Sequence, residues 1–181
     1  MAAVVDWHGR SRGVNLQVLL HTRPRAGKAS RMKRIAEYLA RDRVLFLTST
    51  DKASALNAMV DAIASSKSIE QPDEFRKAVF ARERILSTGI GLGIAVPHAK
   101  IPSVKDFVLA LGISHQGIPF DALDGKPVKI IVMIAGPEHR QEQYLGILAR
   151  STLILKSEKN RSAILAAASE DDVYQLFTQS S

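Results

Sequence analysis

Residues 82–100 read RERILSTGIGLGIAVPHAK, the stretch in which glycines, hydroxyl side chains, basic residues and a histidine lie closest together. Glycines leave backbone N–H groups uncovered and permit left-handed conformations, so consecutive amides can converge on an anion. Ser87 and Thr88 add hydroxyl donors, and Arg82 is suited to a bidentate grip on phosphate. These residues together indicate an anion-binding loop that leads into a short strand.

His98 follows that strand, and Pro97 before it fixes the local backbone. An imidazole that faces an arginine and anion-binding amides can serve as a general base, or as a nucleophile that carries a phosphoryl group. Its ordinary pKa of about 6.5 leaves it largely neutral at cytoplasmic pH. A lone histidine is more often structural than catalytic, so the residues by themselves leave a structural role and a phosphate site both open.

The glycine pattern excludes two common nucleotide sites. The run Gly-Ile-Gly-Leu-Gly at 89–93 lacks the Gly-Lys-Ser/Thr that completes a Walker A loop. It also precedes the predicted strand, whereas the dinucleotide fingerprint follows a strand and opens a helix.

Before the glycines, the sequence predicts a short helix at 32–39, a buried strand at 44–47 and two longer helices. Thr50 and Asp51 are the expected caps of the first long helix, and Pro72 opens the second. The apolar residues expected to face inward from these two helices are Leu56, Met59, Val60, Ile63, Phe75, Val79 and Phe80.

After the glycines, apolar runs at 94–96, 107–113 and 128–135 predict three strands, the last two of the kind that helices cover on both faces. The C-terminal third predicts helices at 141–155, at 161–168 and after a Ser169 cap. In the first of these helices, the periodic leucines are Leu145, Leu148 and Leu153. Helices and strands alternate, which favours an α/β layered domain.

Composition narrows the function further. The chain has 181 residues, 46% of them hydrophobic, and no cysteine, which excludes a disulfide scaffold, a thiolate metal site and a cysteine nucleophile. No apolar run approaches the roughly 20 residues that cross a bilayer, so we expect a protein that is not inserted in a membrane.

The positive charge is confined to the beginning of the chain. Residues 1–34 hold eight basic residues and one acidic residue, whereas 35–181 hold 17 of each. A basic protein would suggest nucleic acid as a partner, but the body of this one gives no such signal, so we expect none. We interpret residues 1–31 as a basic, disordered N-terminal extension and 32–181 as one domain.

Residues 82–100 resemble the active-site signature of the phosphotransferase-system (PTS) enzyme IIA domains of the fructose, mannitol and nitrogen-regulatory class. The shared pattern is Arg-Glu, then Ser-Thr-Gly-Ile-Gly-x-Gly, then Ala-x-Pro-His. The likeness extends from Met32 to Phe177 and includes IPFDALDGKPV at 118–128. It implies a single-domain mixed β-sheet with helices on both faces, located in the cytoplasm.

The resemblance also implies roles for individual residues. His98 would accept a phosphoryl group from an HPr-type phosphocarrier protein and pass it to a IIB domain or use it as a regulatory mark. No metal or organic cofactor is implied, because the histidine itself is the carrier. Arg82 would bind the phosphoryl group, and the remaining phosphate-binding residues would be Ser87, Thr88, Gly89, Gly91, Gly93 and Gln143.

Two positions depart from the family pattern. The resemblance implies a second histidine at the start of the helix after the third apolar strand. Gln143 is the position that matches it best, and a glutamine can donate a hydrogen bond but supplies no charge. His139, in the preceding loop, is a possible substitute or an ordinary surface histidine. Leu92 stands where asparagine is common. The alternative function is therefore a IIA-like regulatory binding module with impaired or no phosphotransfer.

Overall fold

The computed structural model describes residues 34–179. The expected extension at 1–31, and with it the boundary at residue 32, lies outside the described residues. The elements in chain order are a 3-10 helix η1 (Ile35–Glu37), β1 (Leu39–Phe46), α2 (Lys52–Ala64), α3 (Pro72–Ile85), β2 (Gly89–Gly91), β3 (Ile94–Ala95), β4 (His98–Lys100), β5 (Val108–Ile118), β6 (Val128–Gly136), α4 (Gln141–Lys156), α5 (Glu158–Leu165) and α6 (Glu170–Gln179).

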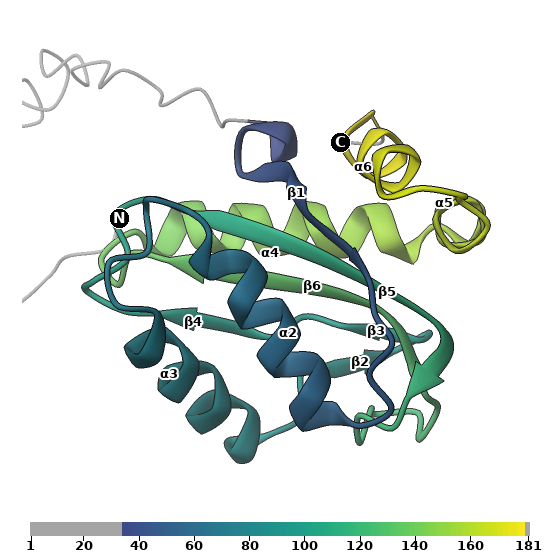
Figure 1. The fold of residues 1–181 in the computed structure, drawn as a ribbon, viewed down its shortest axis with the longest axis horizontal. Helices are drawn as coiled ribbons and strands as arrows, with labels where there is room; N and C mark the ends of the chain where they lie inside the picture. The colour runs from purple at the N-terminus through teal and green to yellow at the C-terminus, as the bar shows by residue number, and fades with distance from the viewer. Residues whose placement is uncertain (1–33, 180–181) are drawn as a thin grey trace, which may run out of the picture. The chain divides into compact units, whose positions relative to one another are not determined.

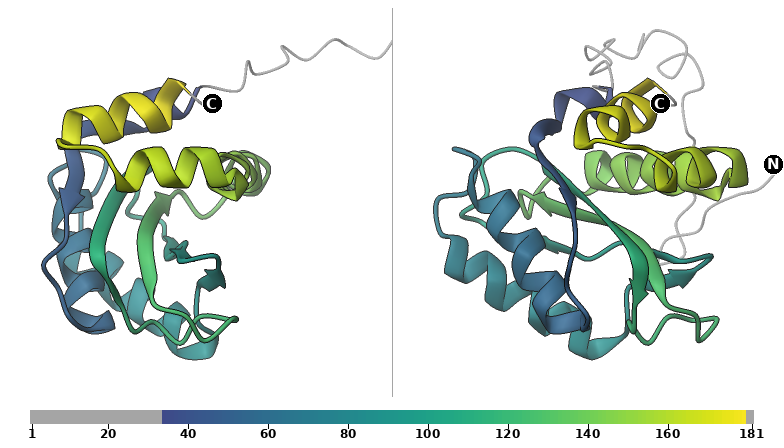
Figure 2. Two further views of the ribbon diagram at one scale, coloured as in Figure 1. Left: turned by 90° about the vertical axis from the view of Figure 1, so that its right-hand side faces the viewer. Right: turned by 45° about the vertical axis from the view of Figure 1, so that its right-hand side comes forward.

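The strands form one mixed sheet in the order β1-β5-β6-β3-β2, and β4 pairs with β6 as well. β1 runs parallel to β5, whereas β5 and β6 are antiparallel, and β3 and β4 run parallel to β6. Helices α2 and α3 cover one face of the sheet, and α4, α5 and α6 cover the other (Figures 1 and 2). The expected α/β fold, a mixed sheet with helices on both faces, is therefore confirmed.

Two hydrophobic cores result, one on each face of the sheet. Beneath α2 and α3, the core contains Leu56, Met59 and Phe75. The opposite core joins the other face of the sheet to α4, α5, α6 and η1. The central strands β5 and β6 contribute to both cores, because successive side chains point to opposite faces of the sheet. This explains why these strands are apolar almost throughout instead of at every second residue.

Helix starts agree well with the cap residues in the sequence. The Asp51 carboxylate accepts a hydrogen bond from the Ser54 amide at 2.9 Å, and Pro72 is the first residue of α3. Ser169 Oγ accepts from the Asp172 amide at 3.2 Å before α6. Helix α5 begins three residues earlier than predicted, because Ser157 caps it.

The start of the domain differs from the prediction. Of the helix expected at 32–39, only η1 is present in the described part, and β1 begins at Leu39 rather than Val44. The pairing of β1 with β5 is irregular between Leu39 and Val44. Arg43 spans this gap by donating from Nε to the Leu109 carbonyl at 3.1 Å. The charged residues in the first half of β1 interrupt the apolar pattern by which a strand is recognised, so the sequence predicted only its second half.

Helix α4 turns a different side to the core than its leucines suggested. Leu145 and Leu153 are 51% and 71% exposed. The buried residues are Tyr144, Ile147, Ser151, Ile154 and Leu155. Their spacing of three and four residues is also helical, so two apolar stripes competed in the sequence. Of the three predicted leucines, Leu148 packs, partly buried, against this core, whereas the other two point to solvent.

The glycine run forms a β-hairpin between β2 and β3. Leu92 and Gly93, at its tip, have φ angles of 58° and 73°, as a type I′ turn requires. The Leu92 amide donates to the Asp124 carboxylate at 3.0 Å. A leucine is strained at positive φ, whereas asparagine and glycine are the residues that this turn favours.

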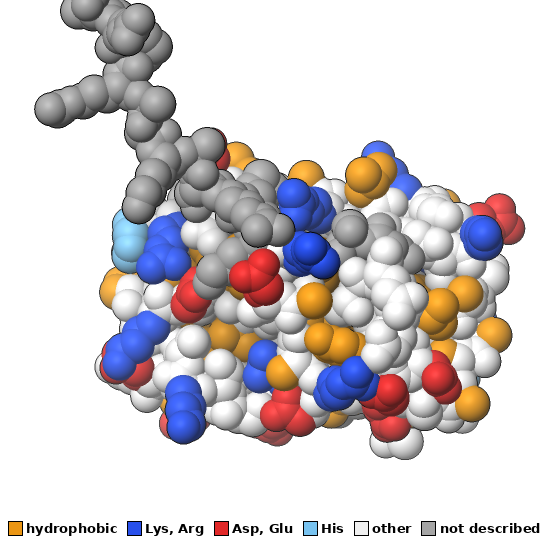
Figure 3. Space-filling model, turned by 90° about the horizontal axis from the view of Figure 1, so that it is seen from above, with side chains coloured by type: hydrophobic (Ala, Val, Ile, Leu, Met, Phe, Trp, Pro, Cys, Tyr) orange, Lys and Arg blue, Asp and Glu red, His pale blue; other side chains and the backbone are white. Residues whose placement is uncertain are grey.

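The surface carries charges of both signs. Figure 3, which looks onto the top of the molecule in Figure 1, shows basic and acidic side chains interspersed among the described residues of that face. Within residues 34–179, none of the helices has the length and apolar character that crossing a membrane requires.

We predict that Leu92→Asn stabilises the protein by about 1 kcal/mol, because asparagine tolerates positive φ better than leucine. Denaturant unfolding measures this change. The matched control is Leu123→Asn, another exposed leucine, which is not at positive φ and should change stability by less than about 0.5 kcal/mol. A Leu92→Asn variant no more stable than wild type would contradict the strain argument.

Candidate functional site

His98 is the first residue of β4, where it pairs with Ile134 of β6, and its side chain is half-buried. The ring nitrogen Nδ1 lies 2.9 Å from the carbonyl oxygen of Val96. A carbonyl oxygen only accepts hydrogen bonds, so Nδ1 carries the proton in this contact. The other nitrogen, Nε2, then holds the lone pair and is the nucleophilic atom of the ring.

Tyr144, in the first turn of α4, provides one wall of the His98 site. The two rings have centroids 5.5 Å apart and are tilted by 48°. The ammonium group of Lys100 lies over the Tyr144 ring, 5.1 Å from its centroid, and also donates to the side-chain oxygen of Gln141. A histidine, a tyrosine and a lysine therefore form one cluster between β4 and α4.

Arg82 approaches the same cluster from the end of α3. Its Nη1 donates to the Leu86 carbonyl at 2.7 Å, which fixes the guanidinium beside the segment that leads to the hairpin. The charge of Arg82 lowers the pKa of both His98 and Tyr144. The charge of Arg82 therefore acts on His98, and the role of Arg82 in binding a phosphoryl group stays a prediction.

Burial lowers the pKa of His98 from its ordinary value of 6.5, and the charges of Arg82 and Lys100 lower it further. The Val96 carbonyl and the Glu83 carboxylate act in the opposite direction but do not reverse the shift. A lower pKa means that the imidazole is neutral at pH 7. Two cations next to a neutral, half-buried nucleophile suit the capture of an electrophile that bears negative charge.

Ser87 and Thr88 have their hydroxyl groups engaged by the protein itself. Ser87 Oγ donates to the Phe120 carbonyl at 2.7 Å. Thr88 donates to the Glu83 carboxylate through its amide at 3.0 Å and through its hydroxyl at 2.6 Å. Both side chains hold the chain between α3 and β2 in place, and these hydrogen bonds direct neither hydroxyl toward His98.

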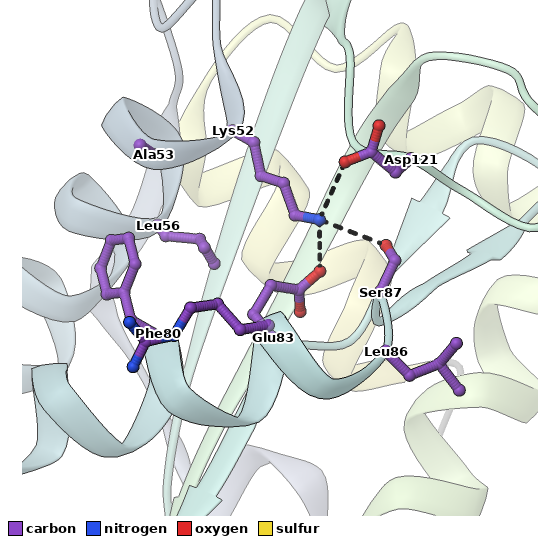
Figure 4. A pocket seen from close by; sticks show the side chains of 9 residues that line it. Lys52, Ala53, Leu56, Phe80, Glu83, Leu86, Ser87 and Asp121 are labelled. Carbon is purple, nitrogen blue, oxygen red and sulfur yellow. Dashed lines mark hydrogen bonds and ion pairs between the residues drawn. The ribbon is translucent and has the colours of Figure 1, made fainter.

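Glu83 is the residue that holds Thr88 in place, and no individual role was assigned to it from the sequence. Its side chain is buried, and it accepts both Thr88 hydrogen bonds and an ion pair from Lys52 at 2.8 Å. Figure 4 shows the Lys52 ammonium pointing at Glu83, Ser87 and Asp121. The Arg-Glu pair in the sequence was a signal for this residue, because a glutamate on the buried side of a helix needs a partner.

A pocket of about 470 Å³ opens beside this ion pair, and His98 is not among its lining residues. It lies between α2 and the end of α3 (Figure 4). Its lining residues are Lys52, Ala53, Leu56, Phe80, Glu83, Arg84, Leu86, Ser87 and Asp121. Within it, Lys52 pairs with the two anions, Glu83 and Asp121. Among residues 34–179, no group of three or more histidine, aspartate and glutamate side chains could hold a metal ion.

The structure does not bring the hairpin glycines to His98. Ile94 pairs with Ile130 of β6, and His98 pairs with Ile134. At about 3.3 Å per residue, the hairpin tip with Gly91 and Gly93 lies roughly 13 Å or more along the sheet from His98. Gly89 serves packing, because a Cβ there would lie 2.8 Å from Ala122.

The two residues considered as a second active-site histidine lie elsewhere. Gln143 donates to the Tyr38 hydroxyl at 2.9 Å, and His139 is exposed in the turn before α4. The residue of α4 that contacts His98 is Tyr144, one position later than Gln143. The buried residues of α4 recur at helical spacing from Tyr144 onward, and this spacing was the sequence signal that could have identified Tyr144.

Known proteins that share sequence or fold with this chain agree with one another. The family model described as "Phosphoenolpyruvate-dependent sugar phosphotransferase system, EIIA 2" matches residues 37–180. The PTS system fructose-specific EIIABC component of Bacillus subtilis (strain 168) is 33% identical over 147 residues, which are 81% of this chain and 23% of that protein. The PTS system fructose-specific EIIA component of Haloferax volcanii is 33% identical over 128 residues, 71% of this chain and 83% of the relative.

A solved structure gives the same result. The crystal structure of Nitrogen Regulatory Protein IIA-Ntr from Neisseria meningitidis has a TM-score of 0.74 at 27% identity and covers 80% of this chain and 99% of its own. The chain thus spans less than a quarter of the Bacillus protein but most of the other two relatives.

We predict that Glu83→Ala destabilises the protein by about 3 kcal/mol, because it leaves the Lys52 ammonium without its buried partner and removes both acceptors of Thr88. Thermal or denaturant unfolding measures the loss. The matched control is Glu70→Ala, which breaks an exposed ion pair with Lys105 and should cost less than about 1 kcal/mol. Equal losses in the two variants would contradict the role given to Glu83.

We predict that the His98 imidazole titrates below pH 6.5 when its ring protons are followed by NMR. Arg82→Gln should raise this pKa, because it removes a positive charge that disfavours the imidazolium. The exposed residue Arg84 is the control, and Arg84→Gln should move the titration less. A wild-type pKa above 6.5 would show that burial and the cations do not dominate the site.

Proposed function

Because the chain belongs to the phosphoenolpyruvate-dependent sugar phosphotransferase system EIIA 2 family, we propose that it is a phosphohistidine carrier with His98 as its phosphoacceptor. The donor is an HPr-type phosphocarrier protein. The phosphoryl group then passes to a IIB partner or acts as a regulatory mark, and the reaction takes place in the cytoplasm.

The observation that supports this proposal most is the state of the His98 ring. The Val96 carbonyl holds the proton on Nδ1, which leaves the Nε2 lone pair free. The lowered pKa keeps that lone pair unprotonated at pH 7. Of the two ring nitrogens, Nδ1 is the one that the described contacts tie to the backbone.

Phosphoryl transfer to this ring balances without an outside reagent. The Nε2 lone pair forms a bond to phosphorus, and the bond between phosphorus and the donor's ring nitrogen breaks, its electron pair returning to the donor ring. The donor's other ring nitrogen and His98 Nδ1 each keep a proton. The donor becomes a neutral imidazole as the His98 ring takes up the positive charge, which the phosphoryl oxygens offset.

The other residues divide into two groups. Arg82, whose charge acts on His98, is the phosphoryl-binding arginine in this proposal. Ser87, Thr88 and the hairpin glycines support the fold around the site, since their hydrogen bonds and packing are used within the protein. Gln143 and His139 have no part in the step.

Both outcomes of the carrier reaction have support among the relatives. Two relatives carry fructose-specific names and one carries a nitrogen-regulatory name. Adding about two negative charges at His98 changes the local charge enough to recruit or repel a partner. The alternative, a binding module without phosphotransfer, is favoured by one observation: the ring of α4 that contacts His98 belongs to a tyrosine, Tyr144, and not to a second histidine.

We predict that the full chain, incubated with enzyme I, HPr and phosphoenolpyruvate, gains the mass of one phosphate that is labile in acid and stable in alkali. His98→Ala should abolish this gain. His139→Ala is the control and should retain it, because His139 is exposed in a turn outside the His98 cluster. A wild-type protein that gains no phosphate would refute the carrier function and leave the binding module.

A further inference from the structure

Strand β4 directs two of its three side chains to the same side. Successive residues of a strand alternate between faces, so His98 and Lys100 share one face and Ala99 occupies the other. Ala99 packs into the core beneath α2 and α3. His98 and Lys100, both half-buried, therefore face α4.

The first turn of α4 holds the Lys100 ammonium against Tyr144, the ring that also contacts His98. The Gln141 side-chain oxygen accepts a hydrogen bond from it, and the Tyr144 ring lies 5.1 Å below it. The same ring lies 5.5 Å from the His98 ring. A cation is attracted to the face of a tyrosine ring, which restricts a side chain that would otherwise sample many rotamers.

The charges around His98 are unequal on its two sides. Arg82 approaches from α3, next to the buried Glu83 carboxylate, which Lys52 neutralises. From the α4 side, Lys100 is the cation whose charge reaches His98. A phosphoryl group brings close to two negative charges, which one guanidinium does not balance.

We propose that Lys100 binds the phosphoryl group on His98 from the α4 side, and that Tyr144 is the positioning residue that holds the Lys100 ammonium over the site. This inference rests on the proposed function. Arg82 and Lys100 then grip the phosphoryl oxygens from opposite sides. A lysine, as a compact charge on a flexible stem, is able to follow these oxygens as the group moves from donor to acceptor.

The test compares the initial rate of phosphorylation by enzyme I, HPr and phosphoenolpyruvate among variants of the full chain. Lys100→Gln should lower the rate roughly tenfold, less than the loss of a fully buried donor because solvent screens this site. Lys100→Arg should stay within about threefold of wild type, because the charge is kept. Lys77→Gln, an exposed lysine of α3, is the control and should match wild type.

Tyr144 is tested through its effect on Lys100. Tyr144→Phe keeps the ring and should retain most of the rate, whereas Tyr144→Leu removes the ring and should lower the rate about as much as Lys100→Gln. The double variant Lys100→Gln/Tyr144→Leu should be no slower than Lys100→Gln, because both changes remove one interaction. Circular dichroism confirms that each variant is folded before its rate is compared.

A second measurement separates charge from packing. The groups that act on His98 are Arg82 and Glu83 from α3, Lys100 from β4 and the Tyr144 ring from α4. In the NMR titration, Lys100→Gln should raise the His98 pKa, and Lys100→Arg should restore it. A merely structural lysine would change neither the titration nor the rate.

Two results would overturn the inference. If Lys100→Gln is phosphorylated at the wild-type rate while His98→Ala is inert, Lys100 has no role and the carrier function stands. If wild type and Lys77→Gln both fail to gain phosphate, the carrier function and the inference fail together.

Discussion

The buried ion pair between Lys52 and Glu83 ties together the parts of the molecule that surround the site. Lys52 begins α2, Glu83 lies near the end of α3, and Thr88, bound to Glu83 through its amide and hydroxyl, precedes β2. A carboxylate this deeply buried requires all of these partners, because an unpaired charge in the interior is strongly unfavourable. The pair therefore fixes how α3 ends and where the next strand begins. Arg82, the neighbour of Glu83, is directed by that same helix end.

Much of the fold could be predicted from the sequence because its signals are local. Cap residues and apolar spacing identify α2 and α3, and continuous apolar runs identify β5 and β6. The signal fails where two patterns compete, as in α4, where an exposed leucine stripe ran beside the buried one. It also fails where the tertiary structure overrides the local pattern, as in β1, whose charged residues lie in an irregular pairing with β5.

The sequence directed attention to the histidine and the arginine of the candidate site, but it did not indicate which other side chains surround them. The resemblance directed attention to His98 and Arg82, whereas the glycines suggested an anion cradle that the sheet register separates from His98. Glycine has several uses, and here a tight hairpin and close packing account for it. Tyr144 was not identified from the sequence because its contact with His98 depends on the rotation of α4 about its axis, which one residue of shift changes by about 100°.

Some paired strands of the sheet are close together along the chain and others are far apart. This difference affects the order in which the strands come together during folding. β5 and β6 are antiparallel neighbours along the chain, with Ile118 opposite Val128, so only a short loop must close to join them. β1 is parallel to β5 and sets Leu39 opposite Leu109, so 69 intervening residues must be ordered or looped out first. Because loop closure becomes entropically less favourable with length, the β5–β6 hairpin is the natural nucleus and β1 a late addition. His98, whose strand docks on β6, lies on the early-forming side of the sheet.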